Sequence, residues 1–220
     1  MSPPRESPPV DRPNPAPRAL LALLACTLCS ISTARAGGGP LGIDYRVTYD
    51  DSGIWNRTNQ KIVLYGMEAT AGLGALWEGG EDRLGKTFGQ SIDAAVASGL
   101  TATGMKYVFS RERPSQTSDP NQWFTGHGQS FPSGEVTVTS ALVTPFVLEY
   151  GHDHPAVYAL EALPVYDAIA RVKVWGHWQT DVIAGFALGF AGGYFLHRPG
   201  SPFIFSIMPH GIQIGFKKQF

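Results

Sequence analysis

Apolar residues fill long runs of the chain, broken mainly by glycine and by single charged residues. Runs of more than about ten such residues favour α-helices over strands. Small residues within them would let a neighbouring helix approach closely. The pattern predicts an all-α helical bundle, with helices over residues 62–77, 84–109, 136–150, 156–170 and 182–196.

Two stretches have the alternation of a strand instead. Residues 43–50 alternate apolar with polar side chains, and residues 203–208 and 212–220 flank a Pro209-His210-Gly211 turn. Such alternation is typical of half-buried strands, and a short turn between two of them indicates a hairpin. We expect a small β element, an N-terminal strand plus a C-terminal hairpin, packed on the helical body.

The N-terminal region has the organisation of an export signal. Residues 1–18 are rich in proline and carry three arginines, residues 19–31 are apolar, and Ala34-Arg35-Ala36 offers a small-x-small cleavage site. This order predicts a signal peptide with a disordered Pro-rich leader over residues 1–36, and an exported, periplasmic domain over residues 37–220. A lipoprotein site at Cys26 and a retained membrane anchor are the alternatives.

The composition excludes several classes of function and of catalytic chemistry. The formal net charge is −1, from 17 Lys and Arg against 18 Asp and Glu, which argues against a nucleic-acid surface. Both cysteines, Cys26 and Cys29, fall before the predicted domain, so it has neither a disulfide framework nor a thiolate nucleophile. No apolar run reaches about eighteen uninterrupted residues. We expect a globule that is soluble or peripherally membrane-associated, and the sequence leaves its oligomeric state open.

The richest chemistry lies just before the last predicted helix. Arg171, His177 and Asp181 fall within eleven residues. On a helix, His177 and Asp181 would share a face, where a carboxylate can hold one ring nitrogen and leave the other free to attack. Arg171 would offer a planar fork of donors to an anion. The alternative is a helix start with satisfied polar groups. His152 and His154 have no third ligand nearby, so the sequence predicts no metal and no cofactor.

Two further patterns lie at predicted helix ends. Lys106 lies at the end of the predicted helix over residues 84–109 and Arg113 follows that helix, while Ser133 and Gly134 precede the next helix. Ser133 is a suitable N-cap, and the amides after it would form an anion site. With Arg171, the three cations suffice to bind a phosphate dianion.

These patterns, taken in order, carry a family resemblance. They are Lys106 with Arg113-Pro114, then Pro132-Ser133-Gly134, then Arg171 with His177 and Asp181. The set resembles the three-part signature of the type 2 phosphatidic acid phosphatase superfamily, which includes bacterial acid phosphatases and vanadium haloperoxidases. The resemblance covers residues 106–181. It implies a metal-independent phosphatase acting on a phosphate monoester or diphosphate, of a small molecule or a lipid such as phosphatidate or a prenyl diphosphate.

The resemblance also implies residue roles. His177 would be the nucleophile that becomes phosphohistidine, and Asp181 the carboxylate that orients it. Phosphate would be bound by Lys106, Arg113, Ser133, Gly134 and Arg171.

Glu135 stands where the family's second motif usually has the histidine that protonates the leaving group, and Ala170 stands where it commonly has serine. Glu135 could itself be the acid, protonated beside bound phosphate, or the leaving group could be good enough to need no proton. His127, in the polar loop upstream, could replace it. The remaining alternatives are a non-catalytic phosphate- or lipid-binding relative and a haloperoxidase.

Overall fold

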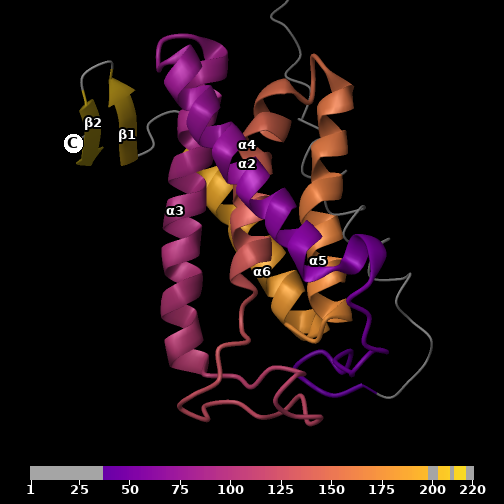
Figure 1. Ribbon diagram of the computed structural model, residues 1–220. Helices are drawn as coiled ribbons and strands as arrows, with labels where there is room; N and C mark the ends of the chain where they lie inside the picture. The colour runs from indigo at the N-terminus through magenta and orange to yellow at the C-terminus, as the bar shows by residue number, and fades with distance from the viewer. Residues whose placement is uncertain (1–36, 198–202, 209–210, 217–220) are drawn as a thin grey trace, which may run out of the picture. The chain divides into compact units, whose positions relative to one another are not determined.

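The computed structural model describes residues 37–197 and the backbone of two short strands between residues 203 and 216. The predicted all-α architecture is confirmed (Figure 1). The helices are α2 (Arg57–Glu78), α3 (Arg83–Phe109), α4 (Gly134–Tyr150), α5 (Ala162–Lys173) and α6 (Gln179–His197), with 3-10 turns η1 (Gly53–Trp55) and η2 (Pro155–Glu161). The predicted signal peptide over residues 1–36 lies outside the described residues and stays a prediction, as does the domain boundary after it.

Helix α4 forms the centre of the bundle. It is apolar around its whole circumference and packs against α2, α3, α5 and α6. A helix without a polar face is stable in a globule only when other elements cover it on all sides. Its buried side chains include Val136, Ala141, Leu142, Val143 and Val147.

Glycines bring α6 against α4. A Cβ at Gly185 would lie 2.6 Å from the Ser133 carbonyl oxygen, and one at Gly189 would lie 2.2 Å from that of Thr137. Both separations are far inside van der Waals contact, so only glycine allows this approach. The glycine-rich run therefore brings the second and third turns of α6 against the start of α4.

Two helix boundaries differ from the prediction. Helix α2 begins at Arg57, five residues early, because the Asn56 side chain accepts a hydrogen bond from the Thr58 amide at 2.8 Å and caps it. The predicted helix over residues 156–170 is instead η2 followed by α5. Pro164 lacks an N–H group, which the first turn of a helix does not need, and it is the third residue of α5.

The β prediction is half right. Strands β1 (Phe203–Met208) and β2 (Gly211–Phe216) form the predicted hairpin, with Phe203 opposite Phe216. The predicted N-terminal strand is wrong, because the described sheet has these two strands alone, and residues 43–50 form only a single bridge, between Gly38 and Asp44. Side chains satisfy this segment instead. Gln179 donates to the Tyr45 carbonyl oxygen and accepts from its amide, at 3.0 and 3.1 Å.

Candidate functional site

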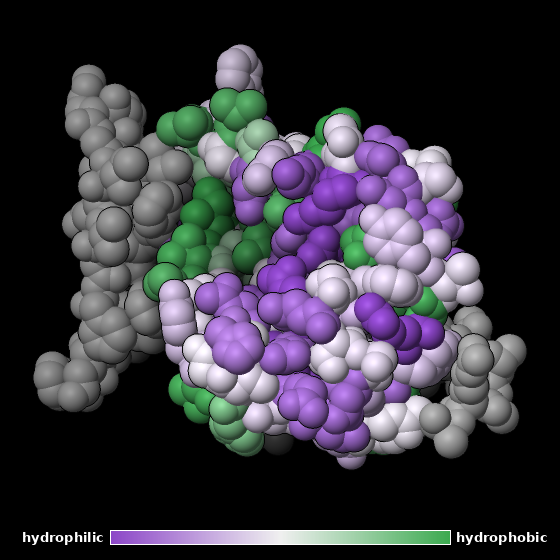
Figure 2. Space-filling model, turned by 60° about the horizontal axis from the view of Figure 1, so that its bottom comes forward, coloured by the Kyte–Doolittle hydropathy of each residue, from purple (hydrophilic) through white to green (hydrophobic). Residues whose placement is uncertain are grey.

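The predicted site residues meet at one end of the bundle, the lower end in Figure 1. There α3 ends, α4 begins, and α5 is connected to α6 by a short turn. Figure 2 brings this end forward, and hydrophilic side chains cover much of it beside a hollow lined by hydrophobic ones. Segments more than seventy residues apart thus supply a common polar surface.

His177 lies in the turn before α6 and is 2% exposed. Its Nδ1 lies 2.7 Å from the carbonyl oxygen of Ser130. A carbonyl oxygen only accepts, so Nδ1 carries the ring proton and Nε2 keeps its lone pair. Burial lowers the pKa of His177 well below its usual value, and the positive charges of Arg171, Lys106 and Arg113 lower it further. The imidazole is therefore neutral.

Asp181 does not hold the ring directly, which corrects the predicted contact. Its Oδ2 is 3.8 Å from His177 Nδ1. The carboxylate turns back to accept from the Trp178 amide at 2.9 Å and from the Ser130 hydroxyl at 2.5 Å. Burial raises the pKa of Asp181, whereas these donors and Arg111 lower it. Asp181 thus fixes Ser130, and Ser130 fixes the imidazole.

Arg111 is the centre of the network behind His177, and the sequence patterns did not single it out. It is fully buried and donates to Asp181 Oδ1 and Asp44 Oδ2, both at 2.6 Å. It also donates to the Thr180 hydroxyl at 2.8 Å, and its guanidinium lies 4.3 Å from the centre of the Trp123 ring. One cation therefore holds an N-terminal segment, the loop after α3 and the start of α6 together.

Lys106 and Arg113 share one carbonyl acceptor, and the charges of both act on His177. The Lys106 ammonium donates to the carbonyl oxygens of Gln129 and Pro132 at 2.9 and 2.6 Å, and Arg113 reaches the same Gln129 oxygen at 3.4 Å. Burial, followed by the charge of Arg113, lowers the pKa of Lys106 to about 8. Two cations crowded this closely favour an anion between them.

Arg171 completes the group of cations and is 5% exposed. Among the described residues its Nε has no hydrogen-bond acceptor, and the nearest carboxylate oxygen, Glu135 Oε2, is 3.9 Å away. Burial lowers the pKa of Arg171, because little compensates its charge. Gly176 makes room for it, since a Cβ there would lie 2.3 Å from Nη2.

Ser133 stands at the predicted N-cap position of α4, but its hydroxyl makes no capping hydrogen bond. That buried hydroxyl has no partner in the described part of the chain, whereas the Ser133 amide donates to the Asp181 carbonyl oxygen at 3.0 Å. The next amides, from Gly134 onward, lack intrahelical acceptors by helix geometry. A Cβ at Gly134 would lie 3.5 Å from Lys106 Cε. Donors without acceptors therefore gather beside the cations.

Glu135 forms a two-pronged ion pair with Arg57, at 2.6 and 2.5 Å, which the sequence did not predict. Arg57 also donates to the side-chain oxygen of Gln60 at 3.0 Å. Burial by itself would raise the pKa of Glu135, but the hydrogen bonds from Arg57 and the charge of Arg171 leave it below its usual value. Glu135 is therefore a carboxylate.

His127 is not part of this group. Its side chain is 69% exposed, and its Nε2 lies 3.1 Å from a carboxylate oxygen of Glu112. Within residues 37–197 and the two strands, no three or more metal-ligating side chains are grouped to hold an ion.

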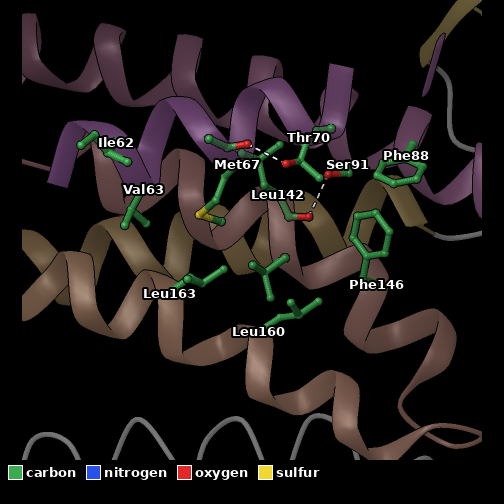
Figure 3. Close-up of a pocket in the computed structure, with 13 residues that line it drawn as sticks. Ile62, Val63, Met67, Thr70, Phe88, Ser91, Leu142, Phe146, Leu160 and Leu163 are labelled. Carbon is green, nitrogen blue, oxygen red and sulfur yellow. Dashed lines mark hydrogen bonds between the residues drawn. The ribbon is translucent and has the colours of Figure 1, made fainter. Parts of the chain in front are cut away.

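An apolar groove of about 370 Å³ runs between α2, α4 and the η2–α5 segment (Figure 3). Met67, Leu160 and Leu163 point into it from different elements. On α4 it is lined from Leu142, seven residues past Glu135 or about 10 Å along the axis. The groove thus lies farther along the helices whose first turns build the polar site.

A family model of the PAP2 superfamily matches residues 92–201, half of the chain and all three sequence patterns. The chain therefore belongs to the PAP2 superfamily, and the resemblance seen in the sequence is confirmed.

Curated relatives share a shorter region. The chain is 35% identical over 100 residues to a protein named lipid A 1-phosphatase from Rhizobium etli, which covers 43% of this chain and 42% of the relative. It is 29% identical over 141 residues to a lipid A 1-phosphatase from Porphyromonas gingivalis, covering 63% of this chain and 29% of that protein. The chain thus spans less than half the length of these relatives.

Two solved structures are similar at 17% identity. They are LpxE of Aquifex aeolicus, with a TM-score of 0.48 over 78% of this chain and 93% of the other, and a transmembrane PAP2-type phosphatidylglycerolphosphate phosphatase of Bacillus subtilis, with a TM-score of 0.43 over 83% and 94%.

Proposed function

We propose that this protein is a phosphatase that transfers a phosphoryl group from a lipid-linked phosphate monoester or diphosphate to His177 and then to water. One observation carries the proposal. The Ser130 carbonyl fixes the proton of His177 on Nδ1, so the unprotonated Nε2 remains for attack while three cations act on the same ring. A neutral, oriented imidazole beside positive charge is what attack on a phosphate dianion needs.

The cations and hydrogen-bond donors around His177 would stabilise the negative charge of the transferred phosphoryl group. Lys106, Arg113 and Arg171 would hold the phosphate oxygens and stabilise the charge that they carry in the transition state. The free Ser133 hydroxyl and the first amides of α4, from Gly134, would add hydrogen bonds. Because these groups supply the positive charge, the proposed reaction needs no metal.

Three observations support a lipid-linked substrate. Relatives carry the name lipid A 1-phosphatase, and the apolar groove of Figure 3 lies along the helices that build the site. Large apolar side chains also project into solvent from the outer faces of α2 and α3. The most exposed of these are Leu73, Trp77, Leu100, Tyr107 and Val108. We propose peripheral contact with a membrane through these side chains, and a periplasmic location follows if the predicted signal peptide is used.

None of the described helices is long and apolar enough to cross a bilayer.

A non-catalytic relative that only binds phosphate or lipid is the second candidate. It is favoured by the ionised state of Glu135, which stands where an acid would protonate the leaving group. A binding protein would retain phosphate without turnover.

Phosphate release separates the two candidates. The purified protein is given p-nitrophenyl phosphate, phosphatidate and a prenyl diphosphate, each with and without a chelator, and His177→Ala is the control. We expect release that the chelator leaves unchanged and that His177→Ala abolishes. Loss of activity in the chelator would refute the metal-free mechanism, and binding without release would favour the non-catalytic protein.

A further inference from the structure

Glu135 lies 3.9 Å from Arg171, and its surroundings keep it ionised. Both of its oxygens accept hydrogen bonds from the Arg57 guanidinium, which α2 brings from 78 residues away. Arg57 is itself held by Gln60. A carboxylate bonded by both prongs of a guanidinium gives up that pair in order to take a proton, which is unfavourable in a half-buried site. Glu135 is therefore a poor proton donor.

Burial raises the pKa of Asp167, on α5, to about 7, but this side chain is 2% exposed and neither of its oxygens has a hydrogen-bond partner among the described residues, so no hydrogen bond connects it to the site. Two further titratable groups near the site, Asp181 and Lys106, are held by partners of their own. Asp181 accepts from Arg111, Ser130 and Trp178, and it lies on the Nδ1 side of His177, not the side that attacks. The Lys106 ammonium already donates to two carbonyl oxygens. Bound phosphate would favour its charged form, so it would hold its proton more tightly during the reaction.

We propose that the site expels its leaving group without protonating it, and that the Arg57–Glu135 pair thereby restricts the enzyme to phosphates whose leaving group is a stable anion, phosphoanhydrides above all. This inference rests on the proposed phosphatase activity and deepens it by naming the substrate class. A lipid diphosphate is such a phosphoanhydride, whereas a simple alkyl phosphate has an alkoxide as its leaving group.

The step balances without an acid. The Nε2 lone pair of His177 forms the P–N bond while the P–O bond to the leaving group breaks, and the leaving oxygen departs with the electron pair. With a diphosphate this oxygen belongs to a phosphate, which is stable as an anion. A water oxygen then attacks phosphorus, the P–N electron pair returns to Nε2, and the proton of the water passes to solvent.

The test is how turnover depends on the leaving group. kcat/KM is measured for aryl phosphates of decreasing leaving-group acidity, for an alkyl phosphate and for a prenyl diphosphate. A well-placed general acid is worth about 10²–10⁴-fold. We expect the alkyl phosphate to be slower than the diphosphate by at least this factor, with a steep decline along the aryl series.

Variants of Arg57 and Glu135 test whether this ion pair causes the dependence of kcat/KM on the leaving group. Glu135→Gln cannot donate a proton, so we expect it to change all rates by a common factor and to keep the steep decline. Arg57→Gln releases Glu135 from its partner, so we expect a selective gain on the alkyl phosphate below neutral pH. The double variant Arg57→Gln/Glu135→Gln removes the charges together, is expected to decline steeply, and serves if either single variant does not fold.

A shallow decline in the wild-type protein, made steep by Glu135→Gln, would overturn the inference and make Glu135 the general acid. That result would leave the proposed function intact. Absence of phosphate release from every substrate would instead contradict the proposed function and this inference with it.

Discussion

Arg111 and Arg171 are both almost completely buried, yet their surroundings are opposite. Arg111 donates to two carboxylates, a hydroxyl and the carbonyl oxygen of Pro120, and it lies over an aromatic ring. Arg171 has one long hydrogen bond to Gln60 at 3.4 Å and a carboxylate at 3.9 Å. The same type of side chain thus has all its charge compensated at Arg111 and little of it compensated at Arg171.

This difference separates scaffold from site. A buried charge is tolerated when partners compensate it, and it raises the energy of the fold when they do not. A bound anion would therefore relieve the energetic cost of burying the uncompensated cations Lys106, Arg113 and Arg171. It would gain nothing at Arg111, whose charge the protein already compensates. We therefore expect substitution of Arg111 to lower the stability of the fold, and substitution of the uncompensated cations to lower activity.

The largest expected effect is on folding. Arg111→Met would leave Asp44 and Asp181 buried without their cation, and breaking a buried pair in this way costs about 3–5 kcal/mol. The free energy of unfolding is measured by urea denaturation. Arg83→Met is the matched control, because Arg83 also pairs with two carboxylates but its side chain is 48% exposed, so we expect a much smaller loss of stability. Equal losses of unfolding free energy in Arg111→Met and Arg83→Met would mean that the buried network around Arg111 does not stabilise the fold more than an exposed ion pair does.

The next largest expected effect is a loss of activity when an uncompensated cation is removed. Arg113→Gln removes one of the uncompensated cations, and the loss of such a stabilising donor lowers kcat/KM by about 10²–10³-fold. We expect the free energy of unfolding to stay the same or to rise slightly, because the repulsion of Lys106 is relieved. Steady-state kinetics and urea denaturation of the same preparation check both halves. If Arg113→Gln unfolds as readily as Arg111→Met, the division into scaffold and site is wrong.

A smaller effect concerns Asp167, a buried carboxyl on α5. Burial, followed by the charge of Glu135, raises the pKa of Asp167 to about 7. The folded state therefore holds a proton that the unfolded chain has lost, so stability falls as pH rises from about 4 to about 7. Asp167→Asn removes this loss, and we expect it to be more stable than the wild type by roughly 1–3 kcal/mol near pH 8 and by less near pH 5.

Urea denaturation of both proteins at the two pH values measures this gain. Glu161, whose pKa burial also raises to about 7, is present in both proteins and cancels in the comparison. A gain that is the same at both pH values would refute a protonated Asp167.

The sequence predicted the helices, because their apolar runs are long. It also predicted the group of cations, because Lys106 and Arg171 lie in the last turns of helices and Arg113 follows four residues after one. The chain order of the three patterns also allowed the family to be recognised. What it could not predict were contacts between distant segments. No local sequence pattern links Asp44 with Arg111 or Arg57 with Glu135. These two ion pairs hold Asp44 and Glu135 as structural carboxylates.

The strand prediction for residues 43–50 failed for a related reason. The alternation there is real, but the side chains of Gln179 and Trp175 bond the backbone of Tyr45 and Val47 in place of a neighbouring strand. Likewise, helical spacing placed Asp181 near His177, and only the structure revealed that the Ser130 carbonyl accepts the hydrogen bond from His177 Nδ1. Periodicity indicates which face is buried, and the hydrogen-bond partner depends on tertiary packing.

The central claim is that His177 Nε2 attacks phosphorus, and trapping the phosphoryl-enzyme tests it most directly. The protein is mixed with a rapidly hydrolysed aryl phosphate, denatured within the first turnover under alkaline conditions that preserve phosphohistidine, digested, and analysed by mass spectrometry. We predict one added phosphoryl group on the peptide that contains His177, absent in His177→Asn. A phosphoryl group on another residue, or steady turnover by the His177→Asn variant, would contradict the account.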